Sequence, residues 1–337
     1  MLHLRAVPCS PLPGRLTEGP LWDDRRQELL WVDIPEGLVH RAALTDGRDG
    51  HDGNDGHDGN DGRDGQDGQG RRDGQGEGDG PGEGDRLDLA PLATLRFDRP
   101  VGAVALCASG ALLAAAGTSL LRLEEDRRVD EAVELAAPDL PDDGLPRRMN
   151  DAAVDPAGRL LAGTMAYDES PGAGALYRLD AGGLVTLLDS VTISNGLGWS
   201  PDGSRLYYAD SPTGRVDVFA YDPESGALSD RRPFAVLDRG VPDGLTVDSE
   251  GRVWVAVWGG GEVLAFTPEG APYARIQVPA SHVTSCAFAG PARDVLVITT
   301  ATAGLDEERL RAEPDAGRLF VCRPGATGLP TTPYADR

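Results

Sequence analysis

The chain has 337 residues, of which 40% are hydrophobic, so it can bury the core of one large domain or two small ones. Its formal net charge of −23 argues against binding to phosphate backbones, so we expect no nucleic-acid partner. No segment approaches the roughly 20 apolar residues of a membrane-spanning helix, and residues 1–13 lack the apolar core of a signal peptide. The four cysteines form no C-x-x-C pair, which favours reduced thiols in a cytoplasmic protein. The sequence gives no sign of an obligate protein partner.

One pattern recurs six times along the chain: a short apolar run, a turn rich in Asp, Pro and Gly, and a second apolar run. The copies occupy residues 18–33, 102–116, 150–164, 195–210, 243–257 and 285–299. Each copy predicts two antiparallel strands joined by a tight turn, because Asp, Pro and Gly adopt the required turn dihedrals. Further strands are predicted after the copies, for example at residues 175–180, 215–222 and 262–268.

Residues 46–85 interrupt the first repeat. From Gly47 to Gly68 a glycine falls at every third position, and the repeated unit is Gly-x-Asp. This stretch has no proline to preorganise a collagen-like helix and almost no apolar residue to bury. We therefore predict a disordered surface insert, with weak, diffuse cation binding as the alternative.

The six copies keep a regular interval. Their turns start at Asp23, Cys107, Asp155, Ser200, Asp248 and Gly290. The later intervals are 48, 45, 48 and 42 residues, and the first falls from 84 to 44 without the insert. A period of about 40–50 residues with four strands per unit is typical of a β-propeller. We predict an all-β fold, a six-bladed β-propeller forming a single domain over residues 1–337, rather than a sandwich with chance repeats. Residues 2–7 are predicted to supply the missing outer strand of the sixth blade.

The register of the copies aligns one further position, five residues before each turn start. The six residues there are Glu18, Gly102, Asn150, Asn195, Asp243 and Ser285. The first strand of a blade is innermost in a propeller, so these positions should form a ring at one mouth of the central channel. Carboxylate and carboxamide oxygens suit Ca²⁺, Mg²⁺ or Mn²⁺ and also accept Zn²⁺, and two close carboxylates repel unless a cation compensates them. The alternative is that Asn, Asp and Gly merely form turns before strands.

Arg148 lies two residues before Asn150 and could bind a substrate carboxylate or hydroxyls through its guanidinium group. Arg147 could do the same or face solvent, and the sequence does not choose between the two. Other catalytic signatures are missing from the sequence, which contains no G-x-S-x-G elbow, no H-E-x-x-H motif and no lysine for a phosphate-binding loop.

Four long segments resemble the family of regucalcin, gluconolactonase and luciferin-regenerating enzyme. They are LTEGPLW at 16–22, RMNDAAVDPAGRLLAGTM at 148–165, ISNGLGWSPDG at 193–203 and VPDGLTVDSEGRVWVAVWGGG at 241–261. The resemblance covers nearly the whole chain outside the insert and implies a six-bladed propeller with one divalent metal ion. The family's metal ligands match Glu18, Asn195 and Asp243.

The resemblance also implies substrate contacts by Arg148, Asn150 and Asp168, the last being the shorter acid at a position that is acidic in the family. Members are typically lactonases that open aldonolactones. The expected function is therefore a metal-dependent hydrolase that opens a sugar lactone to the aldonic acid. Asp243, or a neighbour, would act as general base. A non-enzymatic calcium-binding or scaffold propeller, and a propeller that hydrolyses another ester or a phosphoester, remain alternatives.

Overall fold

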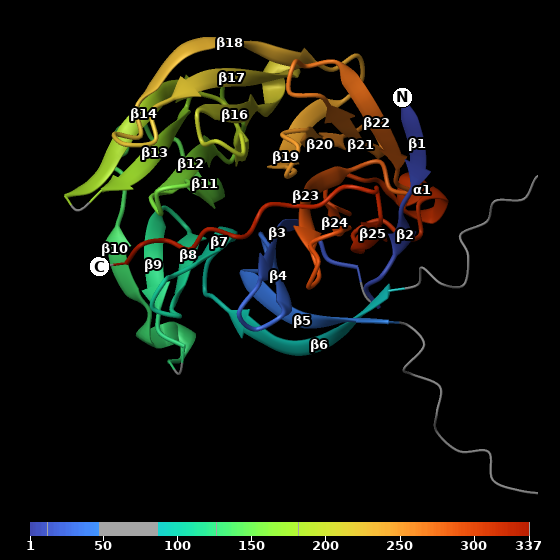
Figure 1. Cartoon of the computed structure of the whole chain (residues 1–337). Helices are drawn as coiled ribbons and strands as arrows, with labels where there is room; N and C mark the ends of the chain where they lie inside the picture. Colours follow the sequence, from blue (N-terminus) through green and yellow to red (C-terminus); the bar gives the residue numbers. More distant parts are fainter. Residues whose placement is uncertain (12, 47–86, 126, 181, 337) are drawn as a thin grey trace, which may run out of the picture.

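Six β-sheets surround a central channel in the computed structural model, which describes residues 1–11, 13–46, 87–125, 127–180 and 182–336 (Figure 1). This arrangement confirms the predicted all-β six-bladed propeller and excludes the sandwich. The innermost strands are β3 (Thr17–Asp23), β7 (Val101–Leu106), β11 (Arg147–Val154), β15 (Ser194–Trp199), β19 (Val241–Val247) and β23 (Val283–Ala289). Each of them contacts the next, and β23 contacts β3, so the inner strands close a ring.

The second and third strands complete the inner part of each blade. The second strands are β4 (Glu28–Asp33), β8 (Leu112–Ala116), β12 (Leu160–Ala166), β16 (Arg205–Asp210), β20 (Val253–Trp258) and β24 (Val295–Thr300). The third strands are β5 (Leu38–Asp46), β9 (Ser119–Leu123), β13 (Gly174–Asp180), β17 (Arg215–Tyr221), β21 (Glu262–Phe266) and β25 (Phe320–Cys322). Second strands such as β20, a continuous apolar run, and β24, apolar up to Ile298, have both of their faces buried between neighbouring blades.

The outer strands face solvent and are more polar. Five blades have their own, which are β6 (Leu87–Arg96), β10 (Val133–Ala136), β14 (Gly183–Val191), β18 (Leu228–Val236) and β22 (Pro272–Gln277). In β18, for example, most side chains are exposed. The α-helix α1 (Glu307–Ala312) lies between β24 and β25. No helix in the described part of the chain is long and apolar enough to cross a membrane. The four cysteines are buried and form no disulfide bond.

The N-terminal segment closes the ring in a different way from the one predicted. Strand β1 (Leu2–Arg5) pairs in parallel with β22 as a fifth strand of the fifth blade, so its assignment to the sixth blade was wrong. The outer strand of the sixth blade is β2 (Val7–Pro8), which pairs with β25, so the prediction is confirmed for Val7. Strand length explains the pairing of β1 with β22. β25 has only three residues with which a neighbour can pair, whereas the outer edge of β22 pairs with all four residues of β1.

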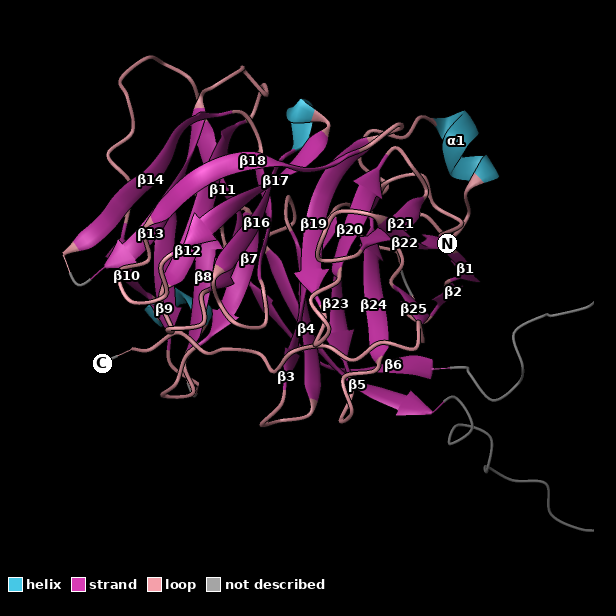
Figure 2. Cartoon of the chain, turned by 45° about the horizontal axis from the view of Figure 1, so that its top comes forward, coloured by secondary structure: helices cyan, strands magenta, loops and turns pink. Residues whose placement is uncertain are grey.

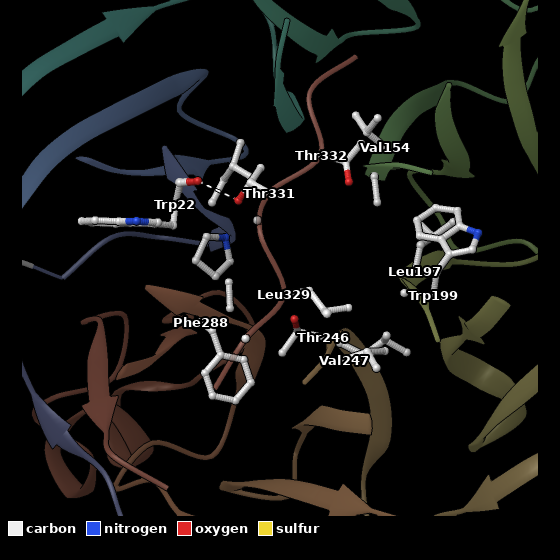
Figure 3. Close-up of a pocket in the computed structure, with 18 of the residues that line it drawn as sticks. Trp22, Val154, Leu197, Trp199, Thr246, Val247, Phe288, Leu329, Thr331 and Thr332 are labelled. Carbon is white, nitrogen blue, oxygen red and sulfur yellow. Dashed lines mark hydrogen bonds between the residues drawn. The ribbon is translucent and has the colours of Figure 1, made fainter. Parts of the chain in front are cut away.

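The C-terminal segment, residues 328–336, crosses the channel at the end away from the predicted ring, which we call the far mouth (Figure 1). This segment donates hydrogen bonds to backbone carbonyls of four successive blades. The donors are the amides of Gly328, Tyr334 and Ala335 and the hydroxyl of Thr331, and the acceptors are, in the same order, Arg293, Leu106, Gly158 and Trp22. A channel cavity of about 430 Å³ lies between this segment and the start of the inner strands, with Leu197, Val247 and Phe288 in its wall (Figure 3). Figure 2 shows the C-terminal segment and α1 on opposite faces of the molecule.

The predicted disordered insert at 46–85 lies almost wholly outside the described residues. Its attachment points are described: β5 ends at Asp46 and β6 begins at Leu87, and these two residues are paired. They lie at the same end of the first blade as the turn between Asp23 and Glu28, whereas Thr17 and Asp33 pair at the other end. Both attachment residues therefore lie on the far-mouth face of the propeller.

Close approach of the inner strands requires glycine at Gly102. A Cβ atom there would lie 2.2 Å from the backbone oxygen of Asn150, which cannot move without shifting β11. We expect Gly102→Ala to lower the free energy of unfolding by about 3 kcal/mol, as overpacked cores do. Gly182→Ala is the matched control because a Cβ at that site meets no atom within 4 Å. Urea denaturation of both variants checks this, and equal stability of the two would contradict it.

Candidate metal and substrate site

The ladder between the first and second strands of every blade breaks its register near the predicted ring position. The breaks fall between Glu18 and Leu21, Val101 and Ala103, Met149 and Ala152, Ser194 and Leu197, Pro242 and Leu245, and Val283 and Ser285. Such β-bulges bend a strand and re-aim its side chains, and they recur next to active sites. The structure thus places all six predicted positions at the start of the inner strands, and we call this end of the channel the ring mouth.

Glu18 and Asp243 form a buried carboxyl pair in the ring. Glu18 is 8% exposed and Asp243 6% exposed. Burial, followed by the charges of Asp243 and Asp151, raises the pKa of Glu18 well above its usual range. The pKa of Asp243 is also raised, first by burial and then by the charge of Asp151. The pair therefore holds protons unless a cation compensates its charge.

A chain of hydrogen bonds links the other polar residues of the ring. Arg148 donates from Nη1 to Oδ1 of Asn150 at 2.6 Å. Asn150 donates from Nδ2 to the Ser194 carbonyl at 2.8 Å and to Oδ1 of Asn195 at 2.9 Å. Asn195 then donates from Nδ2 to the hydroxyl of Ser211 at 2.8 Å. The two asparagine side chains are thereby held in fixed orientations.

The two adjacent arginines have different surroundings. Arg147 donates from Nη1 and Nη2 to the two carboxylate oxygens of Asp143, at 2.7 Å and 2.5 Å. Its Nε donates to the carbonyl of Ala173 at 2.7 Å. Arg148 is buried in the ring, and burial lowers its pKa, while the charges of Tyr167, Glu18, Asp243 and Glu169 act to raise it. Arg147 is thus engaged by Asp143 and Ala173, and Arg148 is the arginine that supplies positive charge beside the carboxyl pair.

Asp168 is not part of this hydrogen-bonded cluster. Its side chain is exposed, and its Oδ1 accepts a hydrogen bond from the amide of Ser170 at 3.0 Å. That contact with Ser170 lowers the pKa of Asp168. The neighbouring Glu169, rather than Asp168, acts electrostatically on Arg148.

Asp151 belongs to the site, although the sequence reasoning missed it. Burial raises the pKa of Asp151 to about 6, and its charge acts on both Glu18 and Asp243. Its side chain lines the channel cavity directly below the ring. Strict alternation along a strand would turn Asp151 away from the side that Asn150 faces, and the bulge between Met149 and Ala152 removes that alternation. Ser211 was also missed, because it lies in the turn after β16 and in no repeated position.

The donor set fits a hard divalent cation. It offers two carboxylates, Glu18 and Asp243, and the carboxamide oxygen of Asn195, in a place where the carboxylates are costly to bury without a positive charge. Within the described ranges, no group of three or more His, Cys, Asp and Glu side chains is arranged to hold a metal ion. The candidate site therefore depends on the amide oxygen as much as on the acids.

Comparison with known proteins supports the resemblance noted in the sequence. Residues 16–302 match the family model of the SMP-30/Gluconolactonase/LRE-like region. Regucalcin from Sus scrofa is 41% identical over 249 residues, which cover 71% of this chain and 82% of that protein. A solved luciferin-regenerating enzyme has a TM-score of 0.76 at 26% identity over 96% of each chain. A calcium-binding regucalcin from Agrobacterium tumefaciens strain C58 has a TM-score of 0.77 at 24% identity over both whole chains.

The fold and the family match together define a six-bladed propeller of the gluconolactonase-like class. The chain belongs to the SMP-30/gluconolactonase/LRE-like family, which confirms the expected relationship.

The raised pKa of Asp151 predicts a pH-dependent stability of the metal-free protein. Its folded pKa of about 6 exceeds the unfolded value of about 3.9, so its contribution is fully present below pH 4 and is lost as the pH rises towards 6. Asp151→Asn should therefore gain stability relative to the unchanged protein across that window, partly because it also relieves Glu18 and Asp243. Denaturation in EDTA at several pH values measures the difference. Asp168→Asn is the contrast, because the lowered pKa of Asp168 predicts a change of slope with the opposite sign, and a slope that changes equally in both variants would contradict the assignment.

Proposed function

We propose that this protein is a metal-dependent lactonase that opens a sugar lactone to the aldonic acid. The observation that carries the proposal is the buried Glu18–Asp243 pair beside Asn195 at the ring mouth, with Arg148 and Asn150 next to it. Membership in a family that includes gluconolactonases supports a hydrolase of this kind.

Glu18, Asn195 and Asp243 would hold one divalent cation through oxygen atoms. This donor set favours Ca²⁺, Mg²⁺ or Mn²⁺ and also accepts Zn²⁺. Such a cation would supply Lewis acidity to the lactone carbonyl and to the attacking water.

Arg148 and Asn150 would orient the substrate. Within the described part of the chain, Arg148 makes its hydrogen bonds through Nη1, to the Met149 carbonyl and to Asn150. Its Nε and Nη2 groups remain for sugar hydroxyls or for the negative charge that develops on the lactone oxygen. Asp168 would contact the sugar only from the rim, because its side chain is exposed.

The proton of the attacking water needs an acceptor. Asp243 would act as ligand and as general base, or pass the second role to Asp151, whose pKa of about 6 lies close to a neutral working pH. A bound cation would lower the pKa of both carboxyls, so metal binding would also produce the deprotonated form that a general base needs.

The test of the proposal is an assay of acid release from gluconolactone and a panel of five- and six-membered sugar lactones, with and without EDTA. We expect turnover that EDTA abolishes and added metal restores. Asp243→Ala should lose metal binding and activity together. Arg148→Ala should keep its metal, because the Ser194 carbonyl still holds Asn150, and should lose most of its activity.

Three outcomes would count against the proposal. No metal-dependent rate on any lactone, despite metal binding, would favour the calcium-binding or scaffold propeller. Turnover of other esters or phosphoesters alone would favour a different hydrolase. Full activity of Asp243→Ala would reject this site.

Deletion of residues 47–86 distinguishes the lactonase hypothesis from the scaffold hypothesis. The insert is attached through Asp46 and Leu87 at the far-mouth face, away from the ring residues. We expect kcat and KM of the deletion variant, with a short Gly-Ser link in place of the insert, to stay within about twofold of those of the full chain, because loop length alone costs little free energy. A large loss of activity at unchanged thermal stability would show that the insert takes part in function.

A further inference from the structure

We propose that Ser211 is a positioning residue that holds the carboxamide of Asn195 with its oxygen turned towards the ring. The inference rests on the proposed metal site and extends it to a side chain that belongs to none of the six repeated positions. Ser211 is 5% exposed, and its hydroxyl accepts the hydrogen bond from Nδ2 of Asn195 at 2.8 Å.

The orientation of Asn195 follows from its neighbours. The backbone carbonyl of Ser194 can only accept a hydrogen bond, so the group of Asn150 that faces it is Nδ2. Arg148 can only donate, which places Oδ1 of Asn150 on the side of the guanidinium group. The same Nδ2 of Asn150 also donates to Asn195, so the atom of Asn195 that receives it is Oδ1.

The nitrogen of Asn195 then has one direction left, towards Ser211. If the amide of Asn195 turned over, two NH₂ groups would face each other at Asn150, and an NH₂ group would replace the oxygen offered to the cation. Asn150 selects the productive orientation, and Ser211 stabilises it because its hydroxyl gives the buried nitrogen of Asn195 an acceptor. A buried donor left without a partner costs about 1–3 kcal/mol, which is enough to loosen the orientation.

The turn after β16 fixes the hydroxyl of Ser211 in place. Asp210, the last residue of β16, accepts hydrogen bonds from the backbone amides of Thr192 and Ile193, which precede Asn195. The amide of Ser211 donates to the Ile193 carbonyl at 3.2 Å, and the hydroxyl of Thr213 donates to the Asp210 carbonyl at 2.7 Å. Gly214, with a φ of 67°, ends the turn. Ser211 and Asn195 are therefore held by one rigid connection.

Ser194 provides a matched control. It is fully buried and adjacent to Asn195, and its hydroxyl accepts a hydrogen bond from Tyr208 at 2.9 Å. Its contact with the ring is made by the backbone carbonyl, which an alanine retains. Ser194→Ala and Ser211→Ala thus remove the same hydroxyl group from two buried sites, and only one of these hydroxyls contacts Asn195.

The experiment is calorimetric titration of Ca²⁺ into the EDTA-stripped full-length protein and its variants. We expect Ser211→Ala to raise the Kd for Ca²⁺ by about 10-fold or more, as the loss of an outer partner of a metal ligand does. Ser211→Cys keeps the side-chain volume approximately and weakens the hydrogen-bond acceptor, so it should also raise the Kd. It replaces Ser211→Ala in the experiment if the alanine variant does not fold. Ser211→Thr, which keeps the hydroxyl, should lie closer to the unchanged protein. Ser194→Ala should retain the Kd even where its melting temperature falls.

The outcomes separate this inference from the proposed function. A Kd of Ser211→Ala equal to that of the unchanged protein overturns the positioning role alone, as does an equal loss of affinity in Ser194→Ala. Binding of Ca²⁺ without lactone turnover overturns the lactonase and leaves the role of Ser211 to be decided by the Kd values. An unchanged protein that binds neither Ca²⁺ nor, in the same titration, Mg²⁺, Mn²⁺ or Zn²⁺ overturns both.

Discussion

The close approach of six inner strands at one end of the channel is the constraint on which the rest of the structure depends. At Gly102 a Cβ atom would lie 2.2 Å from the backbone of the next blade, and at Gly196 it would lie 2.5 Å from the backbone oxygen of Asp243. Backbones this close leave room only for side chains that point into the channel mouth. Glu18, Asn150, Asn195 and Asp243 come from four blades and are far apart in sequence, and this geometry brings them together.

The same closeness sets the electrostatics of the site. Glu18, Asp243 and Asp151 all have raised pKa values, chiefly because burial penalises their charged forms. The cation that the protein places beside them is Arg148, whose own pKa is lowered by burial. Because a buried charge without full compensation is costly, the metal-free carboxyls favour their protonated forms, and a divalent cation would replace those protons. Stability and metal binding are thus coupled at this one place.

Much of this arrangement could be predicted from the repeat register. Aligning the turns was enough to identify the blades and to place Glu18, Asn195 and Asp243 in equivalent positions, because every blade repeats the same strand geometry. Features outside the repeat could not be predicted in this way. The bulge that brings Asp151 inward breaks the alternation on which strand prediction depends. The choice between Arg147 and Arg148 depended on Asp143, which lies in the connection before β11. The pairing of β1 with the fifth blade depended on how short β25 is.

The two ends of the channel are contacted by different segments of the chain. At the far mouth, residues 328–336 bond to several blades and close the cavity, and the insert is attached to the same face. At the ring mouth, residues of the connecting segments that are not part of the repeat contact the polar side chains, as Ser211 contacts Asn195. We therefore expect a change on the far-mouth face, such as the 40-residue Gly/Asp-rich insertion, to leave the carboxyl pair and its amide partners in place. By the same reasoning, we expect specificity for metal and substrate to depend on the connections at the ring mouth, because the connection that contains Ser211 contacts Asn195 directly.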